Sequence, residues 1–293
     1  SYEYAQKLSR EAEKKGVKAQ VHVNVDTGMG RLGISAERAA DMVDRTAALP
    51  YIEIEGLYTH FPIADEADKG FSREQLSIFQ RVAAELEKKG IRPKYRHTPN
   101  SGAVLDFPGE SAFSVIRPGV STFGMYPSGE VDHGVPLKEG MSLKSALIKV
   151  TRFPKGVSVG YGRTFITPRT SVIGVLPIGY GDGFIRDYSN NAEVVIHGSR
   201  VPVVGRVSMD MITVDLTDLP EEARVGDEAV LMGSQEWNGR RASVGSEELA
   251  ERAKTITYEV TCLIGKRVPR VYYYGGRQVG IESLAGTTYP EKL

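Results

Sequence analysis

The sequence predicts an α/β domain built on a parallel sheet, followed by a mainly β domain. In the first half, short β-branched runs alternate with amphipathic helical stretches, and a glycine-rich or polar loop follows each run. After about residue 136 the pattern changes to short strands separated by tight turns such as Asn238-Gly239. The first pattern is typical of right-handed strand–helix–strand crossovers, and the second is typical of antiparallel sheets.

The first half is expected to contain four strands, at residues 20–25, 52–58, 95–97 and 114–116. Helices are expected over residues 4–15, 36–49 and 72–89. Ser72 and Gln75 have the spacing of a capping box, so we expect the third helix to open at Ser72. A Rossmann-type sheet and a (β/α) barrel both fit this repeat, and periodicity alone does not separate them.

The second half is expected to hold a series of strands and one helix. The strands fall at residues 142–151, 171–176, 192–196, 201–204, 211–215, 229–232 and 267–274, and the helix spans 244–254. The expected domains are therefore residues 1–135 and residues 136–293.

Bulk composition narrows the function. The chain has 293 residues with 37 basic and 37 acidic side chains, so its zero formal charge gives no reason to expect nucleic acid as a partner. Its single cysteine, Cys262, excludes an intrachain disulfide and a cysteine-based metal cluster, and we expect no metal. No signal peptide or apolar membrane span is apparent, so the expected location is the cytoplasm. The chain opens inside an expected helix without Met, so we expect it to be part of something longer.

Three loops of the first half could hold an anion. Residues 26–33 combine three glycines with Arg31, which is a bidentate donor, although such a turn is more often only a turn. Ser101 stands at an expected helix start, where an ordinary cap is an equally good interpretation. If the strands close a barrel, Ser101, Gly119 and Val120 would converge on a phosphate site.

Two tyrosines and a methionine mark the loops of the β domain. Tyr161 and Tyr180 each lie between glycines, and Met209 precedes an expected strand. The plain interpretation makes the tyrosines turn aromatics and the methionine core filler.

Taken together, the loops resemble the alanine racemase family of fold-type III pyridoxal-phosphate enzymes. The matching stretches are DTGMGRLG (26–33), GLYTHF (56–61), HTPNSGA (97–103), IRPGVSTFGMYP (116–127), GYGRTF (160–165), PIGYGDGF (177–184), GRVSMDM (205–211) and TYEVTCLIGKRVPRVY (257–272). They follow the family order over nearly the whole chain, so coincidence is not a serious alternative.

The resemblance implies a (β/α)8 TIM barrel followed by a β domain, in a homodimer with shared active sites. It implies pyridoxal 5'-phosphate as cofactor and interconversion of L- and D-alanine, which supplies D-alanine for peptidoglycan. The strands expected here would be the last four of the barrel. The N-terminal quarter, with the cofactor-binding lysine in a K-A-N-A-Y-G motif, would be missing, so the chain alone is expected to be inactive unless a separate segment carries that lysine.

The resemblance also implies catalytic roles. Tyr161 of the partner subunit would be the base on the L-alanine face, with the lysine serving the other face. His60 and Arg117 would form the network that helps Tyr161 act as a base. Arg117 would face the pyridine nitrogen, which stays unprotonated because an arginine is a poor proton donor.

Binding roles carry over in the same way. The implied phosphate contacts come from Ser101, Gly119, Val120 and Tyr258, with Asn100 beside them. Arg31 would reach the cofactor's phenolic oxygen and the substrate carboxylate.

Two further residues would act on the substrate. The Met209 backbone of the partner subunit would contact its carboxylate, and Tyr180 would narrow the entrance to a methyl-sized side chain.

One position departs from the family pattern. Many members carry a carbamylated lysine on the strand before the loop arginine, and Asn24 stands there in this sequence. We therefore expect no carbamate, and a bound anion could take its place beside Arg31.

Two alternatives stay open beside alanine racemisation. One is a broader amino-acid racemase of the same fold acting on serine or lysine. The other is a catalytically inert fragment that acts only in dimerisation. A decarboxylase of the same fold type fits less well, because the GYGRTF and SMDM segments resemble racemases.

Overall fold

The structure is a computed structural model, and it describes residues 1–107, 109 and 114–288. The chain divides into two compact units, Ser1–Lys138 (unit 1) and Glu139–Leu293 (unit 2), which are treated separately below. In the described part of the chain, no helix combines the length and the apolar character that crossing a membrane requires.

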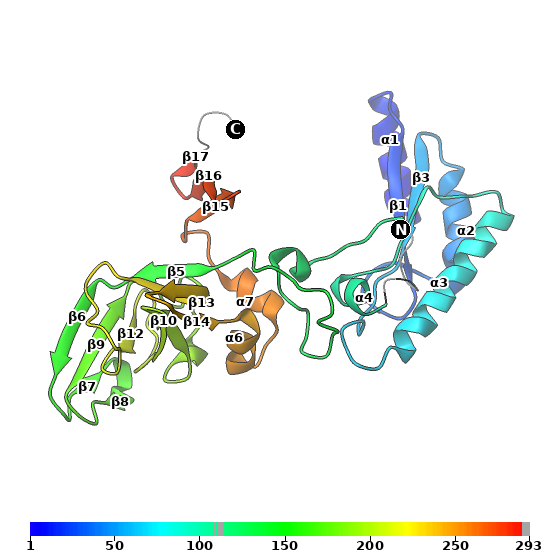
Figure 1. Cartoon of the computed structure of the whole chain (residues 1–293). Helices are drawn as coiled ribbons and strands as arrows, with labels where there is room; N and C mark the ends of the chain where they lie inside the picture. Colours follow the sequence, from blue (N-terminus) through cyan, green and yellow to red (C-terminus); the bar gives the residue numbers. More distant parts are fainter. Residues whose placement is uncertain (108, 110–113, 289–293) are drawn as a thin grey trace. The chain divides into compact units, whose positions relative to one another are not determined.

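Unit 1 is built on a parallel sheet with the strand order β2-β1-β3-β4. Strands β1 and β3 and helices α1 to α4 are labelled in Figure 1. Its strands are β1 (Ala19–Asp26), β2 (Ile34–Ser35), β3 (Ile52–Tyr58) and β4 (Tyr95–His97). Its helices are α1 (Tyr2–Lys14), α2 (Ala36–Ala47), α3 (Gly70–Lys88), α4 (Ser101–Asp106) and the 3-10 turn η1 (Val120–Phe123).

Helices α2 and α3 bury their apolar sides against the sheet. Val43 of α2 and Phe79 of α3 are fully buried in one cluster with Leu57 of β3. Burying each such side chain contributes about 1.5–3 kcal/mol, so this cluster holds the carboxyl ends of the strands in place.

The described residues of unit 1 form an open sheet and no closed barrel. The strand expected at residues 114–116 is wrong, because this segment has no strand conformation. It still runs beside β4, since the Ser114 N–H donates to the Arg96 carbonyl at 3.1 Å. One such bond does not make a ladder, and Pro118, which has no N–H, follows two residues later.

The capping box expected at Ser72 is also wrong. Helix α3 begins earlier, at Gly70, and both Ser72 and Gln75 are fully buried inside it. Gln75 instead donates to the Thr27 hydroxyl and the His60 carbonyl, each at 3.3 Å, and so connects the helix to two loops.

The pairing of β1 with β3 contains one irregularity. Val21 is paired with Ile54 and His22 with Gly56, so Glu55 is an extra residue on β3. Such a bulge turns a side chain in a direction that regular pairing would not allow.

Unit 2 consists of small antiparallel sheets. One has the order β11-β10-β13-β14 with β5 on β13, and others have the orders β12-β9-β6, β15-β16-β17 and β7-β8. The strands are β5 (Leu143–Ala146), β6 (Lys149–Phe153), β7 (Ser158–Val159), β8 (Phe165–Ile166), β9 (Ser171–Leu176), β10 (Glu193–Ile196), β11 (Ser199–Pro202), β12 (Ile212–Asp215), β13 (Glu228–Trp237), β14 (Arg240–Val244), β15 (Arg270–Tyr274), β16 (Arg277–Ser283) and β17 (Gly286–Thr288). The helical segments are η2 (Tyr161–Arg163), η3 (Arg186–Tyr188), α6 (Ser246–Ala253) and α7 (Thr257–Leu263).

The single strand expected over residues 142–151 is two strands. The chain changes sheets between them, since β5 pairs with β13 and β6 pairs with β9. Helix α7 was not expected, because its seven residues are too few to reveal a helical period.

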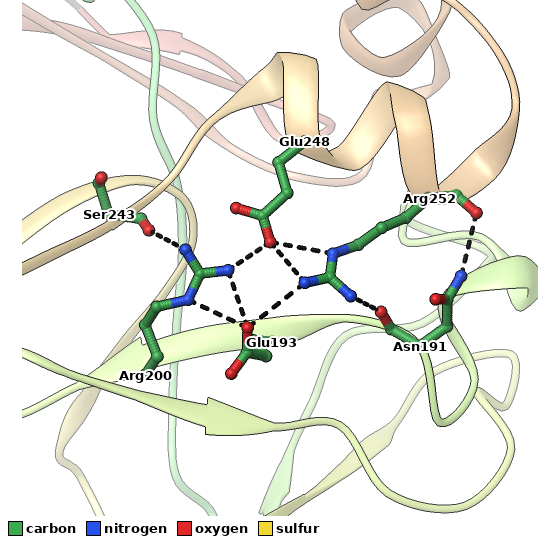
Figure 2. Close-up of polar contacts among 6 residues, drawn as sticks. All are labelled: Asn191, Glu193, Arg200, Ser243, Glu248 and Arg252. Carbon is green, nitrogen blue, oxygen red and sulfur yellow. Dashed lines mark hydrogen bonds and ion pairs between the residues drawn. The ribbon is translucent and has the colours of Figure 1, made fainter.

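A network of four charged side chains joins α6 to the β10–β11 hairpin (Figure 2). Arg200 reaches Glu193 at 2.9 Å and also pairs with Glu248. Arg252 reaches Glu248 at 2.7 Å and Glu193 at 3.3 Å. Each carboxylate therefore bridges two guanidinium groups.

Candidate active site

The first predicted loop is fixed by its own aspartate. The Asp26 carboxylate, at the end of β1, accepts the backbone N–H groups of Gly28, Met29 and Gly30 at 2.9–3.1 Å. These bonds, led by those from Gly28 and Gly30, lower the pKa of Asp26. Gly33 has φ +115°, and a side chain there would meet the Asp26 nitrogen at 2.9 Å, so this turn requires glycine.

Arg117 is the most firmly held cation of unit 1's candidate site. Its guanidinium donates to the carbonyl oxygens of Thr59 (2.6 Å), His97 (2.9 Å) and Thr98 (3.2 Å), all at or just after strand ends. It also lies 5.2 Å from the centre of the Tyr58 ring. Burial lowers the pKa of Arg117.

His97 connects Arg117 to the sheet. Arg117 Nη1 contacts His97 Nδ1, and the His97 ring stacks on Tyr58 with 4.9 Å between the ring centres. Burial, the Arg117 charge and His22 together lower the pKa of His97 from 6.5 to about 4. The ring is therefore neutral near pH 7.

His60 is close enough to both predicted arginines for their charges to affect its pKa. It is half-buried, and burial followed by the charges of Arg117 and Arg31 lowers its pKa. A small cavity of about 80 Å³ is lined by His60, Arg31, Tyr58 and Asn24 among others. The Arg31 side chain is exposed, so its guanidinium is accessible to an anion.

A larger cavity of about 610 Å³ lies behind the same loop, against α2 and α3. None of the predicted site residues lines it, so we assign the chemistry to the smaller cavity.

Three of the predicted phosphate-binding residues, Ser101, Gly119 and Val120, come together in unit 1. The Gly119 N–H donates to the Ser101 hydroxyl at 2.8 Å, and Val120 begins η1 beside them. Asn100 acts as the cap of α4, with its side chain bonded to the Ala103 N–H and the Phe61 carbonyl at 3.1 Å each. Its first role is therefore structural.

Ser121, which the sequence argument did not single out, follows Val120 in η1. Its hydroxyl oxygen is buried and has no hydrogen-bond partner among the described residues. A buried unsatisfied hydroxyl is costly, and a bound oxyanion would satisfy it. The cradle of Ser101, Gly119 and Val120 thus fits a phosphate group.

In unit 2, Tyr161 stands at the tip of the β7–β8 hairpin with 72% of its surface exposed. Gly160 (φ +72°) and Gly162 (φ +70°) flank it in left-handed conformations. A side chain at Gly162 would come within 3.1 Å of the Arg206 guanidinium. The turn therefore presents the phenol outward, where it is available to another surface.

Tyr180 and Met209 lie on two loops that are bonded to each other. The Tyr180 N–H donates to the Ser208 carbonyl at 3.0 Å, and the Gly181 N–H donates to the Met209 carbonyl at 2.9 Å. The Met209 side chain is exposed. The structure thus brings the predicted gate tyrosine next to the predicted carboxylate-binding backbone.

Arg267, which the sequence argument also missed, locks this pair of loops. Its guanidinium reaches Asp182 and Asp210 at 2.6 Å each, and these hydrogen bonds raise its pKa. Its only sequence signal was its place in the TYEVTCLIGKRVPRVY stretch. The remaining predicted phosphate ligand, Tyr258, lies in α7 of the same unit, away from the cradle in the sequence.

In the described ranges, no cluster of three or more His, Cys, Asp or Glu side chains is arranged to hold a metal ion.

Both halves of the chain resemble known proteins. Residues 1–127 match the family model "Alanine racemase, N-terminal domain", and residues 140–272 match "Alanine racemase, C-terminal domain". It is 41% identical to alanine racemase 2 of Caldanaerobacter subterraneus subsp. tengcongensis over 281 residues, which is 96% of this chain and 71% of that protein.

Solved structures agree. The alanine racemase of Clostridium difficile 630 superimposes with a TM-score of 0.90 at 36% identity, covering 97% of this chain and 72% of that one. The Bartonella henselae alanine racemase with covalently bound pyridoxal phosphate gives a TM-score of 0.76 at 28% identity, covering 91% and 70%.

One expectation finds no support in these matches. The family's N-terminal domain model matches from residue 1, so the comparisons do not support the expected loss of a whole N-terminal quarter, although the chain spans 71–72% of these relatives' length. Because the two family models match residues 1–127 and 140–272, and the chain is 41% identical to a relative over 281 residues, the chain belongs to the alanine racemase family.

Proposed function

We propose that this chain is an alanine racemase that uses pyridoxal 5'-phosphate to interconvert L-alanine and D-alanine. The observation that carries the proposal is Arg117, whose guanidinium is fixed by three carbonyl oxygens and a neutral histidine. Among the described residues it has no carboxylate partner. Such a group can hold a hydrogen bond to a pyridine nitrogen without transferring a proton to it.

The residues of unit 1 would hold the cofactor. Its phosphate would bind at Ser101, Gly119, Val120 and the free hydroxyl of Ser121, with Asn100 fixing the start of α4. When bound, pyridoxal phosphate withdraws electrons from the substrate and makes its α-hydrogen acidic. Tyr258 is proposed as a further phosphate ligand on the strength of the family motif alone.

Tyr161 of a partner subunit would hold and return the proton on the L-alanine face. Its exposed position on a glycine-flanked turn supports this role, because the phenol is free to enter a second subunit's site. We therefore also propose a homodimer with shared sites. His60 and Arg117 would form the network that favours the charged form of the phenol.

Substrate selection would depend on three groups. Arg31 and the Met209 backbone would bind the carboxylate, and Tyr180 would limit the side chain to about a methyl group. Because Tyr180 is 44% exposed and lies on a surface loop, serine is the second substrate to consider.

The base for the other face is proposed to lie outside residues 1–293. No lysine of this sequence stands in the family motif. Lys69 is the lysine nearest in sequence to the loop at residues 61–64. Its ammonium group is ion-paired with Asp106, so we do not propose it as the second base. In the same proposal, the sheet of unit 1 is the last part of a (β/α)8 barrel, and unit 2 serves the partner's site.

Two measurements test the proposal. Titration with pyridoxal phosphate, followed by borohydride reduction and intact-mass analysis, should give saturable binding without a covalent adduct on this chain. Racemisation of alanine, serine and lysine is then measured with and without a segment that carries the K-A-N-A-Y-G motif. Activity restored by that segment, highest on alanine, is the expected result. Absence of cofactor binding would contradict the proposal and favour a fragment that only dimerises.

A further inference from the structure

A line of polar side chains leads away from Arg117 along the sheet. Arg117 contacts His97 Nδ1, His97 Nε2 lies 2.8 Å from His22 Nδ1, and His22 Nε2 lies 3.4 Å from a Glu55 carboxylate oxygen. Glu55 lies in β3, His22 in β1 and His97 at the end of β4, and Arg117 lies just before η1. None of the roles assigned above involves His22 or Glu55.

Hydrogen-bonding rules give this line one direction. A guanidinium has donors only, so His97 Nδ1 must accept from Arg117. Neutral His97 then carries its hydrogen on Nε2 and donates it to His22 Nδ1. His22 is then left with its hydrogen on Nε2, which faces the Glu55 carboxylate oxygen at an ion-pair distance of 3.4 Å. Glu55 thereby fixes the tautomer of His22, and His22 fixes the tautomer of His97.

The backbone is adapted to this arrangement at two points. Glu55 is the extra residue of the β1–β3 bulge, which turns its side chain toward His22. A side chain at Gly56 would come within 2.4 Å of His22 Nδ1, so the ring can lie there only because residue 56 is glycine. Tyr95 stacks on the same ring with 5.8 Å between centres.

We propose that Glu55 and His22 are positioning residues for the cofactor site, which act by fixing the tautomer of His97 and through it the orientation of Arg117. The assignment depends on the proposed function in one point only, namely that Arg117 faces the cofactor's pyridine nitrogen. The direction of the hydrogen bonds follows from this chain's own geometry.

The ring nitrogens report the proposal directly. The chain has five histidines, so selective ¹⁵N-histidine labelling gives five ring systems, and a His22→Phe and a His97→Gln spectrum assign two of them. Native His97 and His22 should each carry the hydrogen on Nε2. Glu55→Leu should leave His22 in a tautomer mixture and shift the His97 ring signals, while pyridoxal phosphate binding weakens about five- to tenfold, as for one lost hydrogen bond.

Matched variants separate positioning from general damage. Glu53→Leu, on the same strand and exposed, should leave the His97 signals unchanged. Glu55→Gln keeps an acceptor oxygen and should preserve the native tautomers. Gly56→Ala should disturb His97 as Glu55→Leu does, although it removes no polar group.

Two results would overturn the proposal. One is a His97 hydrogen on Nδ1, and the other is a His97 spectrum that does not change in folded Glu55→Leu or Gly56→Ala protein. A native tautomer pattern without any pyridoxal phosphate binding would instead refute the proposed function and leave the hydrogen-bond order standing.

Discussion

His97 is held between a guanidinium that can only donate and an imidazole that accepts from it. The HTPNSGA stretch marked this neighbourhood in the sequence, but no pattern indicated that His97 would bond to His22. That contact depends on a bulge and on Gly56, and a one-residue irregularity in pairing is not visible in a strand's alternation. By contrast, the meeting of Ser101 with Gly119 was expected, because both stand in loops that were predicted to follow parallel strands.

The free energy of unfolding should depend on pH because the pKa of His97 differs between the folded and unfolded chain. In the unfolded chain its pKa returns toward 6.5, whereas in the folded chain it is about 4. Between these values the unfolded state binds more protons, so the free energy of unfolding should fall as pH falls from 6.5 to 4. Urea unfolding at half-unit pH steps measures the slope. His97→Gln should be less stable at pH 7.5 and should show a shallower fall, and an equally steep fall in this variant would contradict the assignment.

Ser121 allows a test of the phosphate cradle. Because its buried hydroxyl has no partner among the described residues, Ser121→Ala should cost little stability and weaken pyridoxal phosphate binding about three- to tenfold. Thr122→Val is the control, since the Thr122 hydroxyl already donates to the Gly119 carbonyl. Calorimetric titration and thermal melts give both quantities. Unchanged affinity in the Ser121 variant would remove this hydroxyl from the cradle.

At the scale of elements, the sequence predicted most helices and strands and misjudged their ends. The start of α3 was placed at Ser72 because a capping box is a local signal, yet tertiary burial of Ser72 and Gln75 outweighs it. Short elements such as α7 and β7–β8 carry too few residues for a period, so they emerge only from packing.

The network of Figure 2 should stabilise the attachment of α6 to the β10–β11 hairpin. Burial raises the pKa of Glu248, but hydrogen bonds from Arg200 and Arg252 outweigh this and lower it overall. The side chains are 26–34% exposed, so we expect Glu248→Ala to cost only about 1 kcal/mol. A double-mutant cycle with Arg252→Ala in low and high salt measures the coupling. Coupling that is absent at low salt would mean that the network has no stabilising role.

Arg267 should hold the loops that carry Tyr180 and Met209. Its loss leaves the largely buried Asp182 carboxylate without its guanidinium, so Arg267→Ala should speed proteolysis within residues 177–184 and 205–211. Arg267→Lys retains the positive charge but loses the bidentate guanidinium, so its rate of proteolysis should lie between those of the native protein and Arg267→Ala. Limited proteolysis followed by mass spectrometry locates the cuts. Native-like cleavage of the Ala variant would show that other contacts hold these loops.

At the scale of the whole molecule, the proposed site residues fall into two units, with Arg31, His60 and Arg117 in the first and Tyr161 in the second. The change of rhythm near residue 136 was visible in the sequence because a parallel α/β pattern and an antiparallel one differ in period. Which subunit each half serves is a prediction from the family resemblance alone, since no local pattern encodes an interface between copies.

Complementation between variants tests the shared sites. Tyr161→Phe and Arg117→Leu chains should each be inactive in the presence of the lysine-bearing segment. In a random mixture, half of the dimers are mixed and each has one intact site, so about a quarter of native activity should return. No recovery in a mixture shown to exchange subunits would place both residues in the same subunit's site.

The carboxylate of Asp26 has a consequence for kinetics. Because it already occupies the amides of Gly28, Met29 and Gly30, the loop that carries Arg31 is ordered before any ligand arrives. Capture of a carboxylate by Arg31 then requires no prior loop rearrangement and little further loss of chain entropy. Binding at this loop should follow a single exponential whose rate rises linearly with ligand concentration and does not level off, as a preformed receptor predicts.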